Sequence, residues 1–445
     1  ATRSGIPSTD EVLNILGAYH FERVFPVDPK TEKRTREAGM HLWYIVRFDK
    51  DTDLKEAARQ LRKLGEISKI QSNPTLQRAY DPKKKTLYLS ASDLQHVIRT
   101  SEGLTFNDPG LKHQWHYQNT GSYDFVKEGA EAIAGADVNC GEAWKLCKGD
   151  PTIIVAVLDE GVMWNHPDLI GNMWTNEAEE IGSTEDKDGN GYKGDRYGYN
   201  FVKNTGVISW TSAEDTGHGT HVAGTIAAVN GNNKGVGGIA GGDGTENSGV
   251  KIMTCQLFDG AYGCTLAAEA KAIKYAADNG AVILQCSWGY NSPDANEALG
   301  YTPGPKDEQD WENQYPLEKE ALDYFIHNAG SPNGVIDGGL AIFASGNEYA
   351  PSSSYPAGYS KCISVSAIAA DFTPSSYTNY GAEITLCAPG GDGDYYGTPG
   401  VADDEFAWEG KTQGLILSTA IKNGQPAYAY MEGTSVACPH VSGVA

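Results

Sequence analysis

Two continuous apolar runs predict strands of a central sheet. Residues 152–158 (TIIVAVL) and 340–347 (LAIFASGN) are apolar along most of their length, as is typical of strands buried on both faces of a parallel sheet. Between them, residues 220–228 repeat apolar side chains at helical spacing. We therefore expect an α/β domain with a mostly parallel sheet flanked by helices, extending over residues 136–445.

The first 80 residues have the pattern of a separate, smaller domain. Residues 42–48 predict a strand, and residues 54–64 place leucine and alanine side chains on one face of a helix. Asp53 and Glu56 resemble a capping box at the start of this helix, and Gly65 is placed to end it. The pattern also predicts a helix at 12–16 and strands at 21–25 and 66–71. Together these elements make a small α+β domain over residues 1–80.

A polar, turn-rich connector, residues 81–135, joins the two domains. We expect its segment 81–85 (DPKKK) to be exposed and therefore a natural place for an activating cleavage. Charge also divides the chain, because residues 1–100 carry 18 Lys and Arg against 13 Asp and Glu, whereas the remainder carries 17 against 45. This bias predicts attraction between the two parts, although a solvated charged face explains it as well. Nucleic acid is not an expected partner of so acidic a protein.

Length and composition are those of a large globular protein outside the cytoplasm. With 445 residues, 40% of them hydrophobic, the chain can bury a large core. It has no run of 18 apolar residues, so we expect no membrane-spanning segment. Residues 1–5 lack the apolar core of a signal peptide, and we expect that targeting residues were removed. Most of the eight cysteines lie in apolar runs, which favours buried free thiols over disulfides.

Three short segments supply an Asp, a His and a Ser among small residues. They are 155–162 (VAVLDEGV), 217–224 (GHGTHVAG) and 433–443 (GTSVACPHVSG). Acyl transfer by a hydroxyl needs a His to take its proton and a carboxylate to hold the imidazole in one tautomer. Asp159, His218 and Ser435 fit these roles. We expect Asp159 at the end of a strand and Ser435 at a helix N-terminus, with Pro439 in the first turn.

Each of these residues also has an ordinary explanation. An isolated Asp before Gly161 commonly caps a turn. His218 and His221 have a spacing that zinc sites also use, although no nearby Cys or carboxylate completes a zinc motif. Asn347 lies in a Gly-Asn pair, which is a common turn. Its place after an apolar strand favours another role, in which its amide donates to the oxyanion beside the backbone N–H of Ser435.

The segments VLDEGV, HGTHVAG, SGN and GTSVACPHVSG resemble the signature segments of the subtilisin-like serine protease family. The likeness extends from about residue 137 to residue 445. One residue departs from it, because the family usually has Thr or Ser between the Asp and the Gly where this chain has Glu160. The resemblance also implies a helix that continues past Ser435, so we expect further turns beyond Ala445.

The resemblance implies where a peptide substrate lies. Residues 287–289 and the loop 259–263 correspond to the two edges that hold the peptide as an added β-strand. The primary pocket is then walled by two segments and closed by Ser354. These pocket residues are Ser287, Trp288, Gly289, Ala344, Ser345, Gly346 and Ser354. Since none of them is acidic, we expect a medium or large uncharged side chain before the scissile bond.

The resemblance further implies that residues 8–80 are a propeptide that assists folding and inhibits the enzyme. An unrelated adhesion or dimerisation module is the alternative. The tail of the propeptide, residues 73–80, is then expected to run through the substrate groove toward Ser435.

Residues 186–195 (DKDGNGYKGD) predict a structural Ca²⁺ site, because they place oxygen ligands at alternate positions with glycines that allow a tight wrap. The expected ligands are Asp186, Asp188, Asn190, Tyr192 and Asp195. The loop lacks the Glu at position twelve of an EF-hand, and a solvated acidic loop is the alternative. The insertion 291–315 is expected to be a surface loop.

Taken together, these features predict a secreted serine endopeptidase that carries its inhibitory propeptide and acts through an acyl-enzyme on peptides or proteins. Two other classes remain open. One is a catalytically silent binding protein with a protease fold, and the other is a metal-dependent hydrolase that uses His218 and His221.

Overall fold

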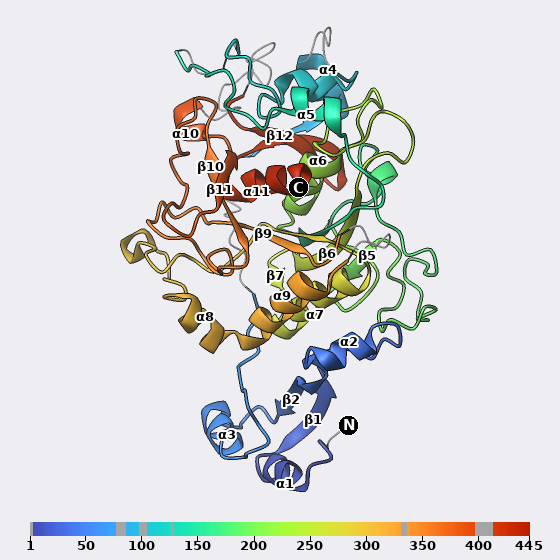
Figure 1. Cartoon of the computed structure of the whole chain (residues 1–445), viewed down its shortest axis with the longest axis vertical. Coiled ribbons are helices and arrows are strands. Elements are labelled where there is room, and N and C mark those ends of the chain that lie inside the picture. Colours follow the sequence, from blue (N-terminus) through green and yellow to red (C-terminus); the bar gives the residue numbers. More distant parts are fainter. Residues whose placement is uncertain are drawn as a thin grey trace.

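A computed structural model places residues 3–76, 86–97, 105–123, 125, 129–330, 336–396 and 413–445. The described chain forms a large body above a smaller N-terminal unit, and both termini of the chain can be located in Figure 1. The expected cleavage segment, 81–85, lies outside the described residues. None of the described helices is long and apolar enough to cross a membrane.

A seven-stranded parallel sheet forms the centre of the body, as the apolar runs predicted. Its strand order is β11-β10-β9-β8-β4-β6-β5, and the short β7 pairs antiparallel with β6. The strands are β4 (Ile154–Glu160), β5 (Gly198–Asn200), β6 (Lys251–Asp259), β7 (Tyr262–Gly263), β8 (Ile283–Cys286), β9 (Leu340–Ala344), β10 (Ile363–Ile368) and β11 (Leu386–Pro389). The predicted α/β fold class is therefore confirmed.

Helices cover both faces of this sheet. Helices α7 (Leu266–Asp278) and α9 (Pro316–Asn328) pack together on one face, and α6 (His218–Ala227) and α11 (Thr434–Val444) pack together on the other. Strand β4 shows why its sequence is continuously apolar. Ala156 and Leu158 belong to the core under α7 and α9, whereas Val155 and Val157 belong to the core under α6 and α11. The body also contains α5 (Cys140–Leu146), α8 (Glu308–Gln314) and α10 (Gly393–Tyr396).

A second sheet joins part of the predicted connector to the body. Strands β12 (Ile416–Lys422) and β13 (Gln425–Met431) form a hairpin, and β3 (Leu87–Ser90) pairs antiparallel with β13. Helix α4 (Ala91–Val97) follows β3, and Leu89 and Leu94 are buried in the same cluster as Leu417 and Tyr430. This part of the connector is therefore an ordered strand and helix of the body.

The N-terminal unit, residues 3–76, is called the leader below. It contains the two-stranded antiparallel sheet of β1 (Ala18–Arg23) and β2 (Tyr44–Phe48) with α1 (Pro7–Ile15), α2 (Glu32–Glu37) and α3 (Leu54–Leu61). Asp53 caps α3 as predicted, since it accepts from the backbone N–H groups of Lys55 and Glu56. The side chain of Glu56 instead binds Arg59, so the reciprocal half of a capping box is absent here.

Three expectations about local structure were wrong. Residues 66–71 form no strand, because this extended segment lies on the body and uses side chains rather than a strand partner for its contacts there. The insertion 291–315 is more than a surface loop, since it contains α8, and Trp311 is fully buried. Cys387 is exposed. All eight cysteines are free, as expected, and six of them are buried.

Candidate active site

The carboxyl end of β4 holds Asp159 beside His218. Helix α6 begins at His218, after Gly217 in the left-handed conformation, with φ of 75°. The two oxygens of Asp159 lie 2.9 and 3.0 Å from Nδ1 of His218, and both side chains are buried. Gly219 allows this approach, because a Cβ there would lie 2.3 Å from the backbone oxygen of Glu160. With Nδ1 on Asp159, Nε2 is the nitrogen that His218 can turn to a substrate or nucleophile.

Ser435 is the second residue of α11 and is held from behind by Ser287. Pro439 is the sixth residue of this helix, so its expected place in the first turn was wrong. A proline in the second turn cannot donate to the carbonyl four residues earlier, which is that of Ser435. The hydroxyl of Ser287 donates to this carbonyl at 2.6 Å instead. The bond fixes the start of the helix without using the hydroxyl of Ser435.

Asn347 follows β9 and points its amide nitrogen toward the same place as Ser435. Its Oδ1 accepts from the backbone N–H and the hydroxyl of Thr434, at 2.8 and 2.9 Å. The amide orientation follows, because an oxygen bound to two donors leaves Nδ2 on the opposite side. A Cβ built on Gly433 would lie 3.0 Å from Oγ of Ser435 and 3.8 Å from Nδ2 of Asn347. Glycine thus keeps open the space that both groups face.

A family comparison identifies this arrangement. A model described as the subtilase family (Peptidase S8) matches residues 150–445. The chain belongs to the subtilase family. The resemblance noted in the sequence is therefore confirmed, and the matched region contains every strand of the parallel sheet.

Several curated proteins are similar to this subtilase. Halolysin of Haloferax mediterranei is 32% identical over 70% of this chain and 44% of its own length. The halolysin-like extracellular serine protease Nep of Natrialba magadii is 29% identical over 59% of this chain and 38% of its own length. A calcium-dependent protease of Trichormus variabilis is 27% identical over 90% of this chain and 54% of its own length. The chain thus spans less than half the length of the first two relatives.

A solved structure agrees with the fold. The serine protease of Aeromonas sobria, solved in complex with a chaperone, aligns with a TM-score of 0.54 and 20% identity. The alignment covers 78% of this chain and 55% of that chain. At this identity the likeness establishes the subtilisin-like fold.

The predicted pocket segments lie together in the structure. The backbone N–H of Ser354 donates to the carbonyl of Ser345 at 2.9 Å, and the N–H of Tyr290 donates to the carbonyl of Tyr355 at 2.8 Å. These bonds join the segment 287–290 to the segment 344–346 through residues 354–355. The ring of Trp288 is buried against Phe343, with centroids 5.5 Å apart, so its side chain belongs to the core.

The two histidines of α6 have separate partners. His221 is fully buried, and its Nε2 lies 3.0 and 3.1 Å from the carbonyl oxygens of Ile416 and Ala429. Burial, with the neighbouring His218 as a smaller cause, lowers the pKa of His221 to about 3. Among the described residues, the group of His, Cys, Asp and Glu side chains close enough to hold a metal includes neither histidine. The structure does not support the two-histidine metal site.

The predicted calcium loop is divided into two parts. Carboxylate oxygens of Glu179, Asp186 and Asp188 lie within 4.8 Å of one another, a donor set that suits Ca²⁺. Asp195 lies apart from them, where it accepts from Tyr275 and Asn190 at 2.7 and 3.0 Å, and burial raises its pKa to about 6. The side-chain oxygen of Asn190 accepts from the backbone N–H of Tyr192 at 2.7 Å. The ring of Tyr192 packs against Tyr199, Phe201 and Tyr275.

Sequence analysis missed two kinds of contributor to these sites. Glu179 was not included because it precedes the loop by seven residues, although it accepts from backbone N–H groups of Lys187 and Gly194. Gln71 and Asn73 of the leader were read only as part of a strand and a tail. Their side chains accept from the N-terminal N–H groups of Leu317 in α9 and Ala267 in α7, each at 2.9 Å. The sequence signal for these helix caps is weak, because it consists of two amide side chains, Gln71 and Asn73, within an extended segment.

Proposed function

We propose that this subtilase is a secreted serine endopeptidase that cleaves peptide bonds through an acyl-enzyme, with its leader as an intramolecular inhibitor. The observation that carries the proposal is the pairing of His218 Nδ1 with Asp159, on a helix that packs against the helix of Ser435. The pair supplies an oriented base, and α11 supplies a hydroxyl among free backbone N–H groups.

Each group then has one role in the reaction. Oγ of Ser435 attacks the substrate carbonyl carbon while its proton passes to Nε2 of His218, and Asp159 stabilises the resulting imidazolium. The negative oxygen of the tetrahedral intermediate accepts from Nδ2 of Asn347 and from the backbone N–H of Ser435. The C–N bond breaks, and the leaving amine takes the proton from His218. Water then repeats the sequence on the acyl-enzyme and releases the acid.

The way the leader binds the body is evidence that the body binds a peptide in extended form. The backbone N–H of Leu76 donates to the carbonyl of Cys264 at 2.8 Å, and the N–H of Leu266 donates to the carbonyl of Pro74 at 2.9 Å. Thr75 and Thr265 form an antiparallel bridge. The leader therefore adds a short strand next to the edge 259–263 that the sequence assigned to substrate binding. Residues 77–80 of the expected tail lie outside the described residues.

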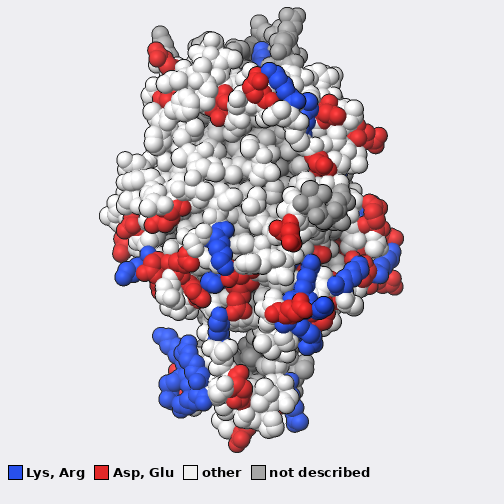
Figure 2. All heavy atoms as spheres, in the orientation of Figure 1, with Lys and Arg blue, Asp and Glu red and all other residues white. Residues whose placement is uncertain are grey.

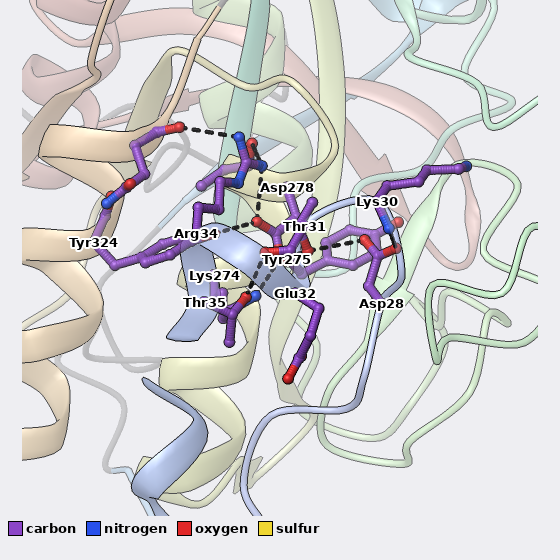
Figure 3. Close-up of polar contacts among 12 residues, drawn as sticks. Asp28, Lys30, Thr31, Glu32, Arg34, Thr35, Lys274, Tyr275, Asp278 and Tyr324 are labelled. Atoms are coloured by element: carbon purple, nitrogen blue, oxygen red, sulfur yellow. Dashed lines mark hydrogen bonds and ion pairs between the residues drawn. The ribbon is translucent and has the colours of Figure 1, made fainter. Parts of the chain in front are cut away.

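Polar pairs join the leader to α7 and α9. The guanidinium of Arg34 in α2 lies 2.9 Å from Asp278 at the end of α7, and Tyr324 in α9 donates to the same carboxylate at 2.7 Å (Figure 3). Lys69 and Trp43 both donate to Glu320, at 2.6 and 2.5 Å. These contacts favour the propeptide assignment over an independent module, because they hold the leader against the two helices on one face of the parallel sheet.

Charge complementarity between leader and body is local. Figure 2 shows a cluster of Lys and Arg side chains at the lower left, on the part of the leader around α3. The ion pairs with the body among the described residues come from other residues, namely Arg34 with Asp278, Lys69 with Glu320 and, at 3.8 Å, Lys30 with Asp188. The predicted attraction therefore rests on these pairs more than on the net charge of the leader.

We further propose that Ca²⁺ binds the three-carboxylate group of Glu179, Asp186 and Asp188 as a structural ion. The backbone N–H groups of Gly189 and Gly191 donate to Asp186 at 2.8 Å and shape the loop around that carboxylate. The name of the Trichormus relative as a calcium-dependent protease supports this assignment.

An uncharged side chain is proposed for the position before the scissile bond, since Ser354 lies between the pocket walls.

Labelling of Ser435 by a fluorophosphonate probe, with the leader attached and after its removal, tests the proposal. We expect labelling and peptide hydrolysis only after removal, and neither in Ser435→Ala. A folded protein that stays unlabelled without its leader would indicate a silent binding protein. Hydrolysis that ignores the probe and is lost to chelators would indicate a metal-dependent hydrolase.

A further inference from the structure

Glu160 is the one residue of the Asp motif that departs from the family pattern, and it lies between Asp159 and the helix of His218. It is the last residue of β4, and its side chain is almost fully buried, with 3% of the residue exposed. A Thr or Ser at this position would be two atoms shorter. The longer carboxylate reaches the chain segment that leads into α6.

Three donors of this segment bind the carboxylate of Glu160. It accepts from the backbone N–H of Thr216 at 3.0 Å, from the backbone N–H of His218 at 3.1 Å, and from the hydroxyl of Thr216 with both oxygens at 3.1 Å. Gly217, the N-cap residue of α6, has no side chain to cap the helix. Glu160 therefore supplies the cap from another element, and its negative charge lies at the positive end of the helix.

The backbone of Glu160 acts on the other partner of the same pair. Its N–H donates to Oδ1 of Asp159 at 2.6 Å, and that oxygen lies 2.9 Å from Nδ1 of His218. One residue thus holds the carboxylate through its N–H and the backbone of the base through its side chain. On the outside of the segment, the hydroxyl of Tyr88 in β3 donates to the carbonyl of Thr216 at 2.8 Å.

We propose that Glu160 is a positioning residue of the catalytic pair, which sets the place of His218 relative to Asp159 and stabilises the protonated imidazole. The proposal rests on the proposed function for its kinetic consequence, but the effect on His218 itself does not require turnover. Tyr88 holds the same segment from the connector side and contributes no charge.

The titration of His218 in Glu160→Gln gives the sharpest test. The groups around the pair that titrate are Asp159 and Glu160 of β4, His221 of α6, Cys438 of α11 and Tyr88 of β3. Loss of one negative charge disfavours the imidazolium, so the pKa of His218 is expected to fall by about one pH unit. NMR of ¹⁵N-histidine in the Ser435→Ala protein measures this shift without any need for activity.

One further variant separates charge from reach, and a second serves as a control. Glu160→Asp keeps the charge and shortens the reach, so we expect the pKa of His218 to stay near its parent value. Asp150→Asn is the matched control. Asp150 accepts from the N–H and the hydroxyl of Thr152, at 2.8 and 2.7 Å, at the opposite end of β4, and its loss is expected to leave His218 unchanged.

Kinetics of the processed enzyme provide the second reading. Glu160→Gln is expected to lower kcat by about 10- to 100-fold with little change in KM, because a displaced base acts on bound substrate. Tyr88→Phe is expected to lower kcat less and to leave the acid limb of the pH profile in place. Equal pKa values of His218 in the parent and Glu160→Gln, or kcat within about twofold, would overturn the inference. An inactive parent with a shifted pKa in the variant would instead count against the proposed function alone.

Discussion

Replacing Glu269 by glutamine should stabilise the protein, and more at alkaline than at acidic pH. Glu269 in α7 and Glu318 in α9 are both fully buried, and the two carboxyls lie close enough to perturb each other electrostatically. Glu318 accepts from Trp311 and Tyr290, at 2.5 and 3.1 Å, whereas neither carboxylate oxygen of Glu269 has a hydrogen-bond partner among the described residues. Burial raises the pKa of Glu318 to about 7, and burial together with repulsion by Glu318 raises that of Glu269 well above its usual range.

The sign follows from proton binding. A carboxyl whose pKa is higher in the folded than in the unfolded protein keeps its proton longer when folded, so stability falls as pH rises from about 4.5 toward 7 and above. A rise of the pKa of Glu318 from 4.5 to about 7 corresponds to about 3 kcal/mol at about 1.4 kcal/mol per pH unit. Glu269 contributes a loss of the same kind, and Glu269→Gln removes that contribution because an amide does not titrate. The amide can also donate to Glu318 at every pH.

Thermal unfolding of the Ser435→Ala chain, monitored by circular dichroism from pH 4.5 to 8.5, measures the effect without autolysis. We expect Glu269→Gln to leave the free energy of unfolding nearly unchanged at pH 4.5 and to raise it by about 1–3 kcal/mol at pH 8. Glu142→Gln, which alters an exposed carboxylate with 66% of its side chain accessible, is the control. A variant destabilised equally at both pH values would show that the buried carboxyls do not share a proton.

Three other predictions concern the proposed site. Asn347→Ala is expected to lower kcat by about 10²–10³-fold with KM nearly unchanged, which steady-state kinetics of peptide hydrolysis would measure. An unchanged kcat would show that Asn347 does not bind the oxyanion. Residues 1–100 added in trans are expected to inhibit the processed enzyme, less at high ionic strength. Arg34→Ala in this fragment should raise the inhibition constant by about tenfold, because it removes the ion pair with Asp278. Arg59→Ala breaks an ion pair within the leader and should leave the inhibition constant unchanged. Equal effects of the two variants would show that Arg34 does not hold the leader on the body. Removal of Ca²⁺ with EGTA is expected to lower Tm of the parent but not of Asp188→Asn, with Asp243→Asn as the control; a chelator effect that persists in Asp188→Asn would place the ion elsewhere.

The sequence predicted those parts of the fold in which one local pattern decides the structure. Strand β4 is apolar on both faces because both faces are covered, and this could be read from residues 152–158. The order of Asp159, His218 and Ser435 and the glycines around them indicated the pairing that the structure shows for the first two. Both are local signals, and tertiary contacts reinforce them.

The errors come from residues whose partners are far away in sequence. The strand predicted over residues 66–71 does not form, because the neighbour of this segment is the body rather than another strand. The sequence around Trp311 is typical of a loop insertion, and the hydrogen bond from its ring N–H to Glu318 is visible only in the structure. Glu160 could only be noticed as a departure, since its cap on α6 spans 58 residues of sequence.

The pairing of β3 with β13 determines which strands would stay together if the proposed cleavage between leader and body occurs. The leader has its own sheet, β1 with β2, and β3 belongs to the sheet of the β12–β13 hairpin. A cut between β2 and β3 would leave β1 and β2 together on the leader and β3 paired with β13 on the body, so that the bridge of Thr75 with Thr265 would be the described strand contact left between the two products. The strand nearest the new N-terminus, β3, would remain hydrogen-bonded to β13, which precedes Ser435 in the chain. A single cleavage would therefore free the leader and leave β3 paired with β13 on the body.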